Sequence, residues 1–200
     1  LVQACAKDPG QEFSAKEAFE KGDYVVALNK WRSAANKGEA KAQVNLGRLF
    51  ALGHGVDKDE VVAISWFRKA IDQGITAAHY NLGIIYETGS LKNFEAAAKH
   101  YRVAAEGGWT EAQTAIGKLY QHGRGVAQDY REAAKWLEKA AVKHDPEAQF
   151  LLGVFYANGW GVERDNGEML HWIRRSARQG YPKALYHVGV AYDQGRGITR

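Results

Sequence analysis

Residues 112–141 read AQTAIGKLYQHGRGVAQDYREAAKWLEKAA, and their spacing indicates two helices joined by a glycine turn. Ala112, Ile116 and Tyr120 are spaced four residues apart, so they lie on one face of a first helix. Trp136 and Ala140 have the same spacing in a second helix. Small residues on such a face let a neighbouring helix approach closely, and the aromatic side chain fills the remaining gap. The stretch therefore predicts a helical hairpin.

The same pattern recurs along the chain with a period of about 36 residues. One column of glycines has steps of 36, 34, 36 and 36, at Gly47, Gly83, Gly117, Gly153 and Gly189. An alanine stands five residues before each of these glycines, and an aromatic residue stands three residues after. A second column falls at Trp66, His100, Trp136 and Trp172. Several columns that agree on one period predict a repeat architecture.

The turn between the two helices of a unit repeats as well. The residues expected to end the first helices in a left-handed conformation are Gly53, Gly123 and Gly159. Those expected to cap the second helices are Asp59, Asp129 and Asp165. The apolar residues expected to hold the turn against the helix pair are Val56, Val126 and Val162. The unit that contains Gly83 is two residues shorter and lacks the valine. We therefore expect a tighter turn there, with Leu91 in place of the valine and Asn93 as the cap.

One such hairpin cannot bury both of its faces, so consecutive hairpins are expected to stack. The predicted fold is all-α, a right-handed superhelical solenoid of antiparallel helix hairpins with a concave inner surface. The predicted divisions are an N-terminal tail at 1–11, a half-matching repeat at 12–38, full repeats at 39–74, 75–108, 109–144 and 145–180, and a truncated repeat at 181–200.

The repeated pattern resembles the Sel-one-like repeat (SLR), a branch of the tetratricopeptide superfamily. Residues 112–141 match it almost letter for letter, and the resemblance covers roughly residues 12–200. Departures include His144 for the closing glycine of the unit, His100 in the tryptophan column and Met169 for an alanine. The resemblance implies a non-catalytic adaptor or scaffold that binds a protein or peptide. This family is common in bacterial envelope, secretion and virulence systems, and in eukaryotic membrane-protein quality control.

Composition excludes several other classes of protein. With 46% hydrophobic and 25% charged residues the chain is typical of a folded protein, and its net charge of +4 comes from scattered residues without a basic stripe for nucleic acid. A single cysteine, Cys5, excludes an internal disulfide and a cysteine-based zinc site. No stretch of the sequence approaches the roughly 20 apolar residues of a membrane span.

The first residues admit three interpretations. Ala4-Cys5-Ala6 fits the small-x-small pattern of a signal-peptidase site, which favours a periplasmic or secreted protein. Residues 2–5 also fit a lipoprotein cleavage box loosely, in which case Cys5 would carry a lipid anchor in the bacterial envelope. The third interpretation is an arbitrary chain end, which leaves a cytoplasmic location open.

No constellation for catalysis, cofactor binding or metal binding is found in the sequence. The seven histidines do not form a zinc-ligand spacing. The Gly-x-Gly turns lack the Lys-Ser/Thr of a phosphate loop, and no Gly-x-Ser-x-Gly elbow is present. We therefore expect no catalytic, cofactor-binding or metal-binding residues, no cofactor, and no enzyme activity.

The resemblance places the first helix of each hairpin on the concave face. Positions three before, one after and four after each repeat glycine would then line a groove for an extended peptide or a helix. Trp160 stands in the variable slot of a Gly-x-Gly turn, where a tryptophan needs cover from a partner or from a neighbouring unit. The aromatic groove residues could instead pack against the adjacent unit. The predicted partner-binding residues are Val44, Arg48, Tyr80, Ile84, Lys118, Phe150, Val154, Trp160 and Tyr186.

Two further functions stay open from the sequence. The chain could be an immunity or inhibitor protein that neutralises a secreted toxin, or an accessory to a cell-wall enzyme. The last hairpin stops inside its turn at 195–200, so the uncovered face of its first helix could mediate self-association.

Overall fold

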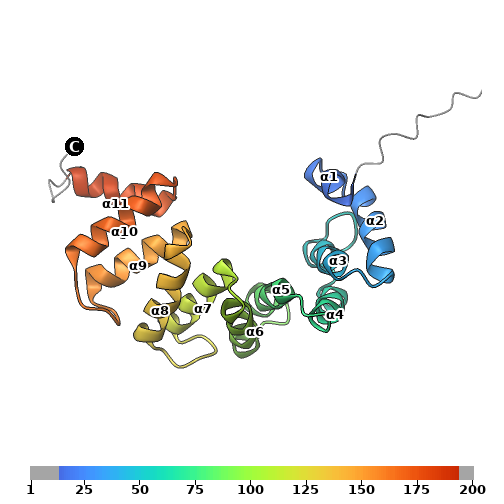
Figure 1. The fold of residues 1–200 in the computed structure, drawn as a ribbon, viewed down its shortest axis with the longest axis horizontal. Coiled ribbons are helices and arrows are strands. Elements are labelled where there is room, and N and C mark those ends of the chain that lie inside the picture. Colours follow the sequence, from blue (N-terminus) through green and yellow to red (C-terminus); the bar gives the residue numbers. More distant parts are fainter. Residues whose placement is uncertain (1–13, 194–200) are drawn as a thin grey trace, which may run out of the picture. The chain divides into compact units, whose positions relative to one another are not determined.

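The computed structural model describes residues 14–193 and the side chains of residues 14–190. This range consists of helices and turns without a strand, so the predicted all-α class is confirmed. The predicted export signal around Cys5 and the final turn at 195–200 lie outside the described residues. The helices are α1 (Ala15–Glu20), α2 (Tyr24–Asn36), α3 (Ala40–Leu52), α4 (Glu60–Ile71), α5 (Thr76–Thr88), α6 (Phe94–Glu106), α7 (Thr110–His122), α8 (Tyr130–Val142), α9 (Pro146–Asn158), α10 (Asn166–Arg178) and α11 (Pro182–Asp193) (Figure 1).

The chain forms two compact units, Leu1–Ala78 and His79–Arg200, and each has its own hydrophobic core. In the first unit, α2 packs on α3 and α3 packs on α4. Their core is built from the small and aliphatic columns of the repeat, with Leu46 and Leu49 fully buried and Trp31 and Trp66 partly buried beside them.

In the second unit each helix from α6 to α11 packs on the next one in the chain. The aromatic ring of Tyr101 and the indoles of Trp136 and Trp172 are buried between consecutive hairpins. The tryptophan column is therefore core, as predicted from its spacing. Among the described residues, no helix has the length and apolar character needed to cross a membrane.

The repeat glycine allows the two helices of a hairpin to touch. A β-carbon on Gly153 would lie 2.6 Å from Cγ1 of Ile173, and one on Gly47 would lie 2.7 Å from the ring of Phe67. Both distances are shorter than a van der Waals contact, so a side chain at either position would displace the second helix or its side chain. Gly189 in α11 occupies the same column, but a β-carbon there would meet no atom of the described residues within 4 Å.

The turn residues behave as predicted, with one exception. The glycines that end α3, α7 and α9 are left-handed, and the carboxylates of Asp59, Asp129 and Asp165 accept backbone hydrogen bonds at the starts of α4, α8 and α10. Asn93 caps α6 in the short turn, as expected. The three valines lie partly buried against the cores. Leu91 is 45% exposed, so the prediction that it replaces the valine is wrong, because the shorter turn does not bring it onto the helix pair.

A column of buried glutamines joins consecutive hairpins. The side-chain Nε2 of each glutamine donates a hydrogen bond to the backbone oxygen eight residues earlier, on the last turn of the preceding helix. The pairs are Gln43 to Ala35 at 3.4 Å, Gln113 to Ala105 at 3.1 Å and Gln149 to Ala141 at 3.0 Å. These bonds satisfy carbonyls that a helix end leaves without an intrahelical partner.

His79 takes the place of this glutamine in the short repeat. Its Nδ1 lies 2.9 Å from Nδ1 of His100, which stands in the tryptophan column. One nitrogen must donate and the other must accept, so the two imidazoles cannot both be protonated while this bond exists. Burial lowers the pKa of His79 below its usual value.

We expect Gly153→Ala to destabilise the protein and Gly189→Ala to leave it unchanged or stabilise it. Overpacking against Ile173 costs about 1–3 kcal/mol, of which the better helix propensity of alanine returns up to about 1 kcal/mol. Gly189→Ala gains the propensity alone, because no atom of the described residues opposes the new methyl group. Urea denaturation followed by circular dichroism measures both variants. Equal effects would contradict the close-contact role of the glycine.

We expect the stability of the protein to fall as the pH drops through the ordinary histidine range, in part because of His79. Its folded pKa is lowered, so the unfolded chain takes up the proton first and is favoured as the pH falls below about 6.5. His79→Gln restores the glutamine of the other repeats and should reduce the loss of stability between about pH 7.5 and pH 5.5. Urea midpoints of both proteins at the two pH values measure this, and parallel losses would refute the role of His79.

Candidate functional site

Three of the predicted partner-binding residues meet in one pocket of the second unit. Tyr80, Ile84 and Lys118 line a pocket of about 230 Å³ between the first helices of consecutive hairpins. Its other lining residues are Glu87, Thr88, Tyr101, Glu111, Thr114, Ala115, Asp145 and Glu147. We call this the acidic pocket, since four of its residues are carboxylates.

Helical spacing brings these side chains together. On α5, Tyr80, Ile84 and Glu87 follow the i, i+4, i+7 pattern of one helix face. On α7, Glu111 and Lys118 are two turns apart on the side that faces α9. The N-terminal end of α9 completes the pocket. The site is therefore made of one helix face, repeated in consecutive hairpins.

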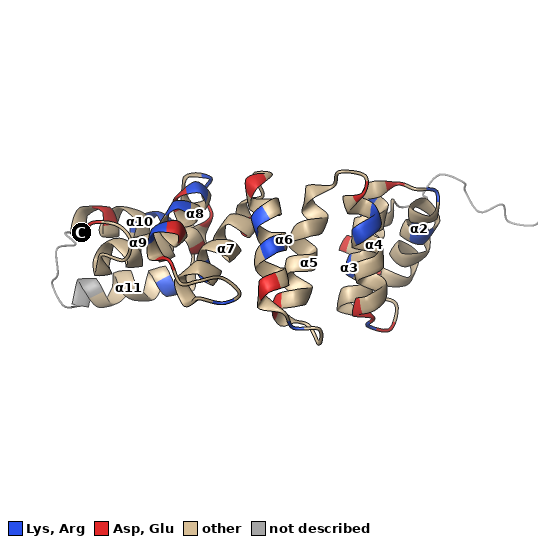
Figure 2. Ribbon diagram, turned by 90° about the horizontal axis from the view of Figure 1, so that it is seen from below, with Lys and Arg blue, Asp and Glu red and all other residues tan. Residues whose placement is uncertain are grey.

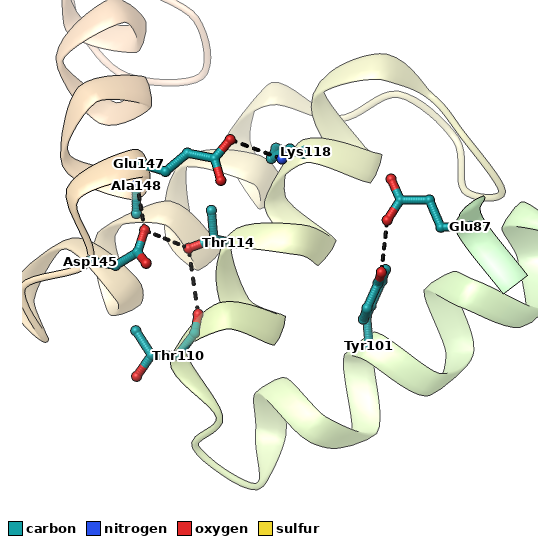
Figure 3. Close-up of polar contacts among 8 residues, drawn as sticks. All are labelled: Glu87, Tyr101, Thr110, Thr114, Lys118, Asp145, Glu147 and Ala148. Atoms are coloured by element: carbon teal, nitrogen blue, oxygen red, sulfur yellow. Dashed lines mark hydrogen bonds and ion pairs between the residues drawn. The ribbon is translucent and has the colours of Figure 1, made fainter. Parts of the chain in front are cut away.

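Two polar contacts fix α9 against α7 (Figure 3). Nζ of Lys118 lies 2.9 Å from Oε1 of Glu147, and the two side chains are 39% and 37% exposed. The Thr114 hydroxyl lies 3.1 Å from Oδ1 of Asp145, and the same carboxylate oxygen accepts the backbone N–H of Ala148 at 2.7 Å. Asp145 thus caps α9 and at the same time links it to α7.

A third contact closes the far side of the pocket. The buried Tyr101 hydroxyl donates a hydrogen bond to Oε2 of Glu87 at 2.7 Å (Figure 3). Burial and this carboxylate raise the pKa of Tyr101 well above its usual value, so the phenol stays protonated and remains a donor. The bond holds Glu87 at the pocket wall instead of leaving it free in solvent.

The pocket carries an excess of negative charge. Burial raises the pKa of Tyr80, and the nearby carboxylates of Glu111, Glu147, Glu87 and Asp145 raise it further. Lys118 is the single cation among the lining residues, and it is already paired with Glu147. A positively charged group would be favoured here, in contact with the rings and methyl groups that form the apolar part of the wall.

The remaining predicted residues do not join this pocket. Val44 and Arg48 belong to the first unit, where Val44 is buried and Arg48 is exposed. Val154 lies partly buried against the core beneath α11. Tyr186 on α11 is 72% exposed.

Phe150 is only 6% exposed, so its side chain lies in the packing between hairpins and not at an open groove. Its ring packs on Tyr181 and His187, with centroid distances of 5.6 and 5.2 Å. Thr114 touches Asp145 and Tyr80 touches Trp109 at the equivalent place, with the Tyr80–Trp109 centroids 6.1 Å apart. The position three before the repeat glycine therefore contacts the residue that precedes the next hairpin, which is the packing alternative considered from the sequence.

Trp160 is covered by the neighbouring hairpin. Its ring is stacked on Tyr130 at a centroid distance of 5.3 Å and meets Phe155 edge-on at 5.7 Å. The adjacent Gly161 packs against the backbone of Tyr130. Of the two explanations for a tryptophan at this turn, the structure shows contact with a neighbouring unit.

Glu111, Asp145 and Glu147 were not found from the sequence. Asp145 stands before Pro146, which is the signature of a helix start, so its capping role was readable. The pocket itself could not be read from the sequence, because it depends on where the start of α9 lies relative to α7. Among the described residues, no group of three histidine, cysteine or acidic side chains is arranged to hold a metal ion.

Comparisons with known proteins agree with this architecture. The chain is similar to a solved structure of c5321, a protective antigen of uropathogenic Escherichia coli with an SLR fold, at 35% identity and a TM-score of 0.79. That match covers 86% of this chain and 37% of the antigen, so the chain spans little more than a third of the antigen's length. A Sel1 repeat protein from Oxalobacter formigenes is 32% identical with a TM-score of 0.79, over 92% of this chain and 77% of that one.

A more distant likeness concerns the fold alone. The immunity protein Pa5087 of Pseudomonas aeruginosa is 23% identical with a TM-score of 0.58, over 90% of this chain and 69% of that one. No curated protein sequence matches the chain. The family model of the Sel1 repeat matches residues 40–75, 76–109, 110–141, 146–181 and 182–200. The chain belongs to the Sel1 repeat family.

Proposed function

We propose that the chain is a non-catalytic scaffold that binds a partner protein at the acidic pocket, and that a lysine or arginine of the partner enters this pocket. Sel1 repeats commonly serve in protein interactions and are typically non-catalytic. The observation that carries the proposal is the combination of Tyr80 and Ile84 with four carboxylates around one cavity.

The pocket suits the two parts of a long basic side chain. The apolar stem of a lysine or arginine would contact Tyr80 and Ile84, and the ring of Tyr80 would add a cation–π contribution. The charged end would meet Glu111, which makes no ion pair with any described residue, and Glu87. Charge complementarity of this kind sets the orientation and the association rate of a partner.

Several groups of the pocket are engaged in holding the helices, which favours binding over catalysis. The Lys118 ammonium is paired, and the Tyr101 hydroxyl donates to Glu87. The Thr114 hydroxyl is bonded to Asp145 at the start of the next hairpin. A preorganised wall of this kind loses little side-chain entropy when a partner binds.

The immunity and cell-wall alternatives have no separate support from the site. The likeness to the Pseudomonas immunity protein is one of fold. An immunity role would itself be a form of protein binding, and rescue of growth from a co-expressed toxin would distinguish it from an adaptor role.

We expect peptides selected by the immobilised protein from a random displayed library to be enriched in lysine or arginine beside apolar residues. Tyr80→Ala should weaken the best synthetic peptide on the order of thirtyfold, since loss of an aromatic anchor costs about 2 kcal/mol. Tyr186→Ala is the matched control, because Tyr186 holds the same repeat position but lies outside the pocket, and it should change the affinity less than about twofold.

Fluorescence anisotropy of the labelled peptide measures these affinities, and circular dichroism verifies that both variants remain helical. Selected peptides without basic residues would refute the charge assignment. Equal losses in the two tyrosine variants would refute the acidic pocket as the binding site.

A further inference from the structure

A second surface of the protein carries charge of the opposite sign. One face of α10 presents His171, Arg174, Arg175 and Arg178 around a shallow depression that also includes Leu170. Within the part of the chain that the structure describes, none of these four side chains forms an ion pair with a carboxylate. We call this surface the arginine face.

The equivalent helices of the preceding hairpins pair a lysine with an acid of the same helix. On α6, Lys99 pairs with Glu95 at 2.8 Å, and Figure 2 shows basic and acidic segments together along this helix. On α8, Lys135 pairs with Glu132 at 3.1 Å. In the repeat alignment, Gly167 of α10 stands where α6 has Glu95.

Further along the same face, the acid of α6 is replaced by a base. Arg178 of α10 stands where α6 has Glu106, and Arg174 stands where α8 has Glu138. At each of these two positions only one sister helix carries an acid, since α6 has Arg102 at the position of Arg174 and α8 has Val142 at the position of Arg178.

This excess of charge is not explained by the stability of the helix. Basic residues in the last turn do favour the negative end of the helix dipole, which accounts in part for Arg175 and Arg178. Arg174 and Arg178, however, are an i, i+4 pair of like charge, an arrangement that weakens an isolated helix. Arg175 is placed differently, since its guanidinium lies over the ring of Trp172, 5.6 Å from the centroid. The face is thus not neutralised by ion pairs among the described residues, and Arg178 is exposed while Arg174 and Arg175 are partly exposed.

We propose that the arginine face is a second interaction surface, which binds an extended acidic segment of a partner protein. Arg174 and Arg178 are separated by four residues, or about 6 Å along the helix axis. Side chains at alternate positions of an extended peptide are about 6.6 Å apart on one side. Two carboxylates at alternate positions can therefore each meet one guanidinium, whose planar fork pairs bidentately with a carboxylate.

The composition of the face favours a peptide over a nucleic acid or a membrane. Leu170 provides an apolar contact beside the arginines, which a phosphate backbone would not use. The neighbouring second helix α8 interleaves three basic residues with two acids, whereas α10 has three arginines and a single acid, Glu168, in its first turn. Its three arginines are fewer than the roughly four to eight basic residues of a typical anionic-lipid cluster, and a nucleic acid is held through contacts to several phosphates.

The probe for this proposal is a fluorescein-labelled peptide with glutamates at alternate positions and a central leucine, titrated with the whole chain in about 50 mM salt, where surface charges are weakly screened. The expected result is saturable binding that weakens as salt is added. The double variant R174Q/R178Q should bind on the order of tenfold more weakly, because two exposed charge pairs are lost. R174K/R178K should retain most of the affinity.

The matched control is K135Q/K139Q on α8, which removes the same charge from the neighbouring outer helix and should change the affinity less than about twofold. Tyr80→Ala should also leave this peptide unaffected, which separates the proposal from that for the acidic pocket. No binding by the wild-type chain, equal losses in the α8 and α10 variants, or tighter binding of a single-stranded oligonucleotide of equal charge or of phosphatidylglycerol vesicles would overturn it.

Discussion

Close contact between the two helices of each hairpin is the constraint on which the rest of the structure depends. The contact exists because the repeat glycine presents no side chain to the ring or branched side chain of the second helix, as at Gly47 with Phe67 and Gly153 with Ile173. Helices that approach this closely bury the alanine column of the first helix and the tryptophan column of the second. The caps and left-handed turns then end each helix and satisfy its free backbone groups.

Contacts between hairpins reuse a few positions with different side chains. The column of buried glutamines links one hairpin to the last turn of the preceding one, and His79 replaces it in the short repeat. The position three before the repeat glycine likewise touches the next hairpin through a ring or a hydroxyl, as Thr114 does with Asp145. Sequence variation at these positions changes the local chemistry without changing the stacking, which is how a repeat protein acquires distinct surfaces.

The two charged surfaces of the second unit follow from such variation. The acidic pocket forms on first helices, where carboxylates of consecutive hairpins converge near Tyr80. The arginine face forms on a second helix, where Gly167 and Arg178 stand at positions that are acidic in α6. Because the surfaces lie on different helices and have opposite charge, one chain could hold two partners, or two segments of one partner, at the same time.

The sequence by itself determined the helical hairpins, their caps and their core columns, because these depend on residues within one repeat or its immediate neighbour. It did not determine which groove positions stay accessible. The same repeat position is held by Tyr80, Phe150 and Tyr186. Tyr80 lines a pocket, Phe150 is buried and Tyr186 is exposed. Tyr181 and His187 cover Phe150, whereas α11 has no following helix among the described residues to cover Tyr186. Only the tertiary structure decided this, since exposure depends on the size and placement of side chains contributed by the next hairpin.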